Sequence, residues 1–77
     1  MTSDDSAVFV RLLGEGTVVY RPSPATRIAE DVYRLERPKD YDPDDETWEF
    51  PPGSTVRCER RMLDGSPAMV AVTLDSR

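Results

Sequence analysis

The sequence predicts an all-β protein, a small antiparallel sheet of five or six strands closed into a barrel. Short runs rich in β-branched and aromatic residues recur along the chain at intervals of roughly ten residues. Turn-forming residues separate these runs, and no stretch has an unambiguous helical pattern. Seventy-seven residues suffice for one domain with a small core. Closure into a barrel is favoured at this size because it leaves few open strand edges.

The first two strands are predicted on either side of a glycine-rich turn. The run AVFVRLL (residues 7–13) alternates, so that Val8, Val10 and Leu12 share one face. The turn sequence GEG follows, and TVVYR (residues 17–21) resumes the β-branched and aromatic character.

Two prolines follow the second run. Pro22 and Pro24 each lack an amide donor, so this stretch is predicted to lie at a sheet edge or a bend. At the other end, residues 1–6 are acidic and polar and are expected to form a disordered N-terminus. The predicted domain then spans residues 7–75.

Residues 24–36 are compatible with two structures. A helix is indicated by a proline suited to a helix start and by the spacing of Ala25, Ile28, Ala29, Val32 and Leu35. A strand–turn–strand with the turn at Glu30-Asp31 is favoured, because the neighbouring segments are all strand-like. An α+β fold with one helix over residues 24–36 is the alternative.

The second half of the chain predicts three further strands. Residues 47–50 suit a brief strand with Trp48 and Phe50 on one face. Residues 54–63 alternate, with Val56 and Cys58 inward and Arg57, Glu59 and Arg61 outward. Asp64-Gly65 is a strong hairpin signal. A last strand is predicted after it, with inward side chains Val70, Val72 and Leu74.

The pattern VFVRLL, GEGTVVYRP, VYRLE and WEFPPGSTVRCE resembles small bacterial proteins of unassigned function. The hairpin in which Gly16 precedes Tyr20-Arg21 is also similar to SH3-like and Tudor-like barrels. The resemblance implies a binding domain for peptides, nucleic acid or protein surfaces. Tudor-type domains hold a methylated cation between aromatic rings, but the six aromatic residues of this chain are expected to be needed mostly by the core.

Acidity is concentrated in one segment. The net charge is −5, and residues 40–49 hold six acidic residues and no basic residue. The rest of the chain carries nine acidic and ten basic residues. A single cysteine, the lack of a signal-like start and the lack of a long apolar run indicate a reduced, cytosolic protein without a membrane segment.

The composition argues against an enzyme. The chain has no histidine, which excludes Ser-His-Asp and Cys-His nucleophile systems and the commonest metal ligand. Its single cysteine, Cys58, sits at an inward strand position and cannot build a structural zinc site. Asp40, Asp42 and Asp44 match the first ligand positions of a calcium loop, but Asp45 replaces its glycine and Pro51 its last glutamate. No cofactor or metal is expected.

The acidic segment is predicted to bind a protein partner with a basic surface. Aromatic residues beside charges are typical of protein interfaces, where rings carry binding energy and charges steer encounter. The candidate residues are Asp40, Tyr41, Asp42, Asp44, Asp45, Glu46 and Trp48. In the competing interpretation, Trp48 and Phe50 plug one end of the barrel and the acids only keep the loop solvated.

The alternative function is nucleic-acid binding by an arginine face, for which the candidate residues are Tyr20, Arg57, Arg60 and Arg61. Cross-strand pairing of these arginines with Glu15, Glu36 or the acidic segment is the simpler interpretation. The sequence does not define an oligomeric state.

Overall fold

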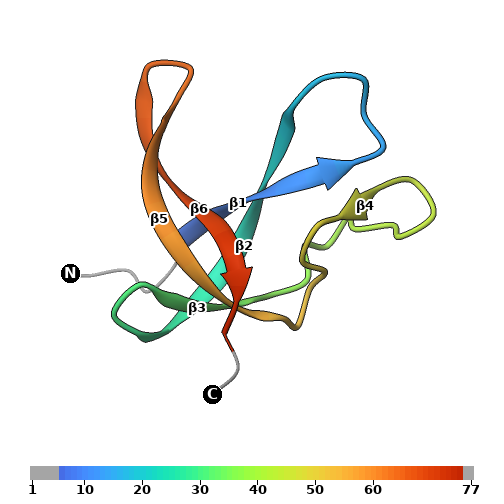
Figure 1. Ribbon diagram of the computed structural model, residues 1–77. Coiled ribbons are helices and arrows are strands. Elements are labelled where there is room, and N and C mark those ends of the chain that lie inside the picture. The colour runs from blue at the N-terminus through green and yellow to red at the C-terminus, as the bar shows by residue number, and fades with distance from the viewer. Residues whose placement is uncertain (1–5, 76–77) are drawn as a thin grey trace.

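The computed structural model describes residues 6–75, which form six β-strands (Figure 1). The strands are β1 (Ser6–Leu13), β2 (Val19–Ala29), β3 (Val32–Leu35), β4 (Thr47–Trp48), β5 (Thr55–Leu63) and β6 (Ser66–Leu74). The predicted all-β class is therefore confirmed. Of the predicted disordered N-terminus, residues 1–5 lie outside the described residues, and Ser6 already belongs to β1.

All six strands form one sheet that curls nearly into a ring. Its order is β2-β3-β5-β6-β1-β4, and β2 also pairs with β1. Every pairing is antiparallel except that of β1 with β6, which is parallel and consists of Val8 with Met69 and Phe9 with Val70. The sheet is thus mixed, and its near-ring is not formally a barrel, whereas the sequence predicted a closed antiparallel one.

The two prolines of β2 lie where the strand has an open edge. β2 pairs with β1 as far as Ala25, and its pairing with β3 begins only at Ala25. The carbonyl of Pro24 accepts the amide of Glu36 at 2.8 Å, so the polar atoms of Pro24 face away from β1. Pro22, two residues earlier, has the same orientation. Neither missing amide donor is needed by β1, and the predicted edge position is confirmed.

Residues 24–36 form strand, turn and strand, so the alternative of a helix there is wrong. Glu30 and Asp31 make the turn, and Asp31 has a φ of 64°, in the left-handed region. A helix would have to bury Ile28 along with Leu35, but Ile28 is 44% exposed. Pairing with β1 and β5 on the two outer sides satisfies the amides of this unit in the sheet.

The core fills the inside of the ring with alternate side chains of the strands, as the alternation predicted for β1 and β5. Its members are Val8, Val10, Ala25, Tyr33, Leu35, Trp48, Phe50, Val56, Cys58 and Ala71.

The inward side of β6 differs from the prediction. Leu74 pairs with Val56 on the inward side, although it is 60% exposed. Val70 is buried but pairs with Glu59 on the outward side, and the core position belongs to Ala71. The cause is a β-bulge: Arg57 pairs with Thr73, the next residue Cys58 pairs with Ala71, and Val72 is left over. An extra residue shifts the alternation by one, so the predicted face holds at Leu74 but is wrong for the residues of β6 before Val72.

Two hairpins extend beyond the core. The inner face of β5 is buried at Val56 and Cys58 but exposed at Arg60 and Met62. The tip between β5 and β6 is the predicted Asp64-Gly65 turn, with φ values of 52° and 82° that suit a tight hairpin. The residues joining β1 to β2 are likewise exposed. In Figure 1 both tips reach beyond the ring on the same side of the molecule.

Candidate functional site: an acidic loop anchored to the core

The acidic segment forms a folded loop between β3 and β4. Asp42 organises it, because its side-chain Oδ1 accepts the amide of Asp44 at 2.9 Å. The carbonyl of Asp42 also accepts the amides of Asp45 and Glu46, at 3.0 and 3.1 Å. The sequence favours this turn locally, since aspartate before Pro43 commonly starts one. The carboxylates are therefore displayed by a defined backbone.

Trp48 anchors the loop to the core. It pairs with Leu12 of β1 and is only 4% exposed, inside the core. Its Nε1–H donates to Glu46 Oε1 at 2.8 Å, which supplies the partner that a buried indole needs. The ring of Tyr41 meets the Trp48 ring edge-on, with centroids 5.1 Å apart and planes at 73°. Trp48 and Phe50 are therefore both buried, as in the interpretation that gives these two residues to the core.

Arg21 of β2 forms two ion pairs with acids of this loop. Its guanidinium contacts Asp40 Oδ1 at 2.6 Å and Glu46 Oε2 at 3.2 Å. Arg21 pairs with Val10 across the sheet and so points to the inner side of the ring, with its side chain 23% exposed. The segment itself holds no base, but the fold brings one to it. Two of its six acids thus share one cation.

Sequence reasoning missed Arg21 as part of the site. The available signal was alternation: Val19, Arg21 and Ser23 share the side of β2 that faces Val10 and its neighbours. A charge at an inward position requires a partner. Ser23, fully buried, meets the same requirement by donating its hydroxyl to the carbonyl of Glu36 at 3.2 Å.

The other four acids of the segment are exposed: Glu49 follows β4, and three carboxylates stand on the loop. Asp42, Asp44 and Asp45 are exposed at the tip of the loop, and we refer to them as the acidic surface. Tyr41 lies at its base, half-buried, with the guanidinium of Arg37 stacked 5.6 Å from its ring centre. Of the predicted partner-binding residues, the structure therefore separates an outer set from an inner one. The inner set is Glu46 and Trp48, which hold the loop to the core, and Asp40 contacts Arg21 from an exposed position.

The spacing of aspartates that resembles a calcium loop does not produce a metal site in the described part of the chain. Among residues 6–75, no group of three or more metal-ligating side chains comes together. Asp40 is turned to Arg21, and Asp42 is used in the turn.

The four residues of the arginine alternative do not line a single groove. Tyr20 and Arg61 line one groove together with Arg11 and Glu49. Arg60 lines a different groove, and Arg57 contacts Asp75 at 3.3 Å. Arg61 contacts Glu59 at 2.9 Å. Pairing with acids is thus observed for Arg57 and Arg61, although the partners differ from the predicted Glu15, Glu36 and acidic segment.

Cys58 is a core side chain. It is 2% exposed, and burial, with a contribution from the carboxylate of Asp31, raises the pKa of its thiol to about 11. Cys58 packs in the core, at the inward strand position that the sequence predicts.

We expect Cys58 to react with a disulfide reagent about a hundredfold more slowly in the folded protein than in urea at the same pH, because thiolate is the reactive form. The raised pKa also favours the neutral thiol in the fold. Stability linked to this group is complete below the unfolded pKa and declines as the pH rises towards 11. Cys58→Ala should remove that decline. Immediate reaction of the native protein would contradict the burial.

Comparison with protein-family models, with curated proteins and with solved structures finds no match to this chain. The structure defines the chain as a small all-β domain with a six-stranded mixed sheet in a near-ring. Within the described residues, no helix is long and apolar enough to cross a membrane.

Proposed function

We propose that the protein is a non-enzymatic protein-binding module that presents its acidic surface, Asp42, Asp44 and Asp45, to a basic partner. One observation carries the proposal: these three exposed carboxylates stand on a loop fixed to the core through Trp48, Glu46 and Arg21. We further propose that the near-ring belongs to the SH3-like class of small barrels, on the resemblance of the hairpin before Tyr20-Arg21.

Anchoring matters energetically because binding orders flexible groups at a cost. A long mobile loop would lose about 0.5–1.5 kcal/mol for each side chain that the partner immobilises, besides the cost of fixing its backbone. Here the backbone is held by the bonds to Asp42 and by the packing of Tyr41 on Trp48. The loop therefore offers its carboxylates with part of that cost already met.

The charge distribution indicates the partner's chemistry. The exposed carboxylates lie close together in sequence, and the whole chain carries −5. A partner surface rich in lysine or arginine would be steered towards the loop, and exposed charge pairs of this kind weaken as salt rises. Tyr41, at the base of the acidic surface, supplies an aromatic contact for the same partner.

The test is capture of partners by matched baits. One bait carries the wild-type sequence, and the second carries Asp42→Asn, Asp44→Asn and Asp45→Asn. Asparagine at position 42 retains the side-chain oxygen that accepts the amide of Asp44, so the turn is preserved.

A third bait controls for net charge. It carries Glu30→Gln, Glu49→Gln and Glu59→Gln, three exposed acids outside the acidic surface. A basic protein retained by the first and third baits but lost from the second is the expected result. Equal capture by all three baits would overturn the proposal. Capture of nucleic acid by the wild-type bait, lost on mutation of Tyr20 and Arg61, would favour the arginine alternative instead.

A further inference from the structure

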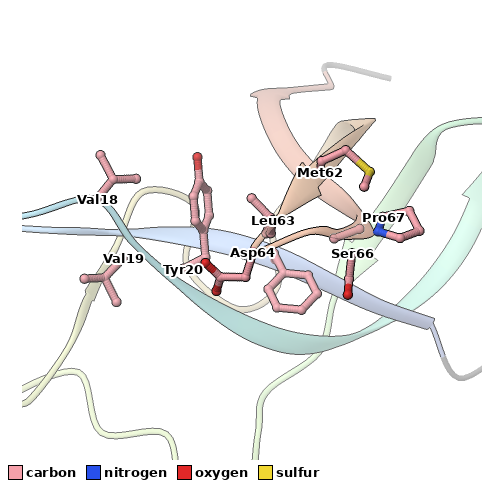
Figure 2. Close-up of a pocket in the computed structure, with 10 residues that line it drawn as sticks. Val18, Val19, Tyr20, Met62, Leu63, Asp64, Ser66 and Pro67 are labelled. Atoms are coloured by element: carbon pink, nitrogen blue, oxygen red, sulfur yellow. The ribbon is translucent and has the colours of Figure 1, made fainter.

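The two hairpins that extend beyond the core enclose an apolar groove between them. One side is formed by Val18, Val19 and Tyr20 of the β1–β2 unit, and the other by Met62, Leu63 and Pro67 of the β5–β6 unit. Figure 2 shows the side chains of both units that line this groove. We call the groove the hairpin notch. Its volume is about 550 Å³, within the range typical of ligand sites.

The hairpin notch exposes apolar surface that the fold itself does not use. Val18 is 59% exposed and Met62 is 65% exposed, and neither belongs to the core cluster. Each lies at the projecting end of its hairpin. Apolar side chains gathered around a concave site, rather than scattered singly, mark a place where another molecule docks.

The charged groups within the notch and on the adjoining β1–β2 turn are acidic. Asp64 is the single charged residue that lines it, and Glu15 is the single charged residue of the exposed turn between β1 and β2. Arg11 and Arg61 line a neighbouring groove with Glu49. A second copy of the chain would bring acids against acids and two net charges of −5 together, which opposes self-association.

We propose that the hairpin notch binds a short segment of a partner protein in which an apolar side chain neighbours a lysine or arginine. The apolar side chain enters between Val18 and Met62, and the cation faces Asp64 and Glu15. This surface is separate from the acidic surface, because Tyr20 lines the notch while the next residue, Arg21, points to the inner side of the ring and holds the acidic loop. The inference therefore goes beyond the proposed function and does not depend on it.

The probes are three short, end-blocked peptides titrated into isotopically labelled protein. In the first, leucine alternates with lysine; in the second, serine replaces leucine; in the third, glutamate replaces lysine. We expect the first to bind and to shift the amide signals of notch residues. The second and third should each bind about tenfold more weakly or worse, since each lacks one of the two required contacts.

Variants locate the contact. Val18→Ser with Met62→Ser should weaken binding of the first peptide about tenfold. Ile28→Ser with Leu74→Ser, an exposed apolar pair outside the notch, should leave it unchanged. The bait variant with three asparagines in the acidic surface should still show the notch shifts, so the two proposals can fail separately.

Several results would overturn this inference. They are no binding of the leucine–lysine peptide, equal binding of the serine–lysine peptide, shifts confined to the acidic surface, or an unchanged affinity in the Val18→Ser, Met62→Ser variant. Sedimentation that reveals a dimer of the free protein, lost in the same variant, would assign the notch to a second copy and would also overturn it.

Discussion

Replacing Trp48 with alanine is expected to lower the free energy of unfolding by about 3–5 kcal/mol, the usual cost of deleting a large buried aromatic side chain. Trp48 belongs to β4, is 4% exposed and packs in the core. Small domains commonly have about 5–15 kcal/mol in total, so this one change removes a large share. Urea unfolding followed by circular dichroism measures the loss.

The companion variant Trp48→Phe separates packing from hydrogen bonding. It retains an aromatic ring for the edge-on contact with Tyr41 but removes the Nε1–H that Glu46 accepts. We expect a smaller loss of about 1–3 kcal/mol. If Trp48→Ala unfolded at the same urea concentration as the wild type, Trp48 would not be a core residue, and the anchoring of the loop would be wrong.

Replacing Arg21 with glutamine is expected to cost about 1–3 kcal/mol, the second largest effect. The reason is the carboxylate of Glu46, which is 19% exposed and would lose its cation. Asp40, at 76% exposed, contributes little, because water screens it. Arg34→Gln is the matched control, since Arg34 and Glu36 form an exposed pair whose loss should change stability little.

A double-mutant cycle assigns the loss to the pair. Arg21→Gln and Glu46→Gln, made singly and together, should show a favourable coupling, because the second change costs less once the first is made. A coupling indistinguishable from zero would mean that the 3.2 Å contact between Arg21 and Glu46 contributes nothing to stability.

The strands were largely predictable from the sequence because each is a local pattern. Alternation in residues 7–13 and the Asp64-Gly65 signal suffice for a strand and a hairpin, whatever the rest of the chain does. The inward face of β6 was not predictable in the same way. A single bulge in β6, opposite Arg57 and Cys58, reverses the alternation, and no residue of β6 indicates it in the sequence.

Closure of the sheet was harder to predict. The parallel pairing of β1 with β6 joins residues some sixty positions apart, such as Val8 and Met69, through only two pairs. Sequence patterns carry little information about such contacts, because they depend on how the intervening strands twist together. The distinction between a near-ring and a barrel therefore required the structure.

The candidate site was predicted in outline but not in its division of roles. The acidic segment and its aromatics were evident from composition. Which acids point outward was not, because that depends on Arg21, which the fold brings from a separate strand. Trp48 likewise could be core or interface until its pairing with Leu12 was known.

The most direct test of the central claim, that the acidic loop is the binding surface, is site-specific cross-linking to the captured partner. A photoreactive phenylalanine analogue is placed at position 45 in the loop and, in a separate protein, at position 30 in the exposed turn between β2 and β3. The account predicts a cross-link to the same partner from position 45 and none from position 30. A cross-link from position 30 alone, or equally from both, would contradict it.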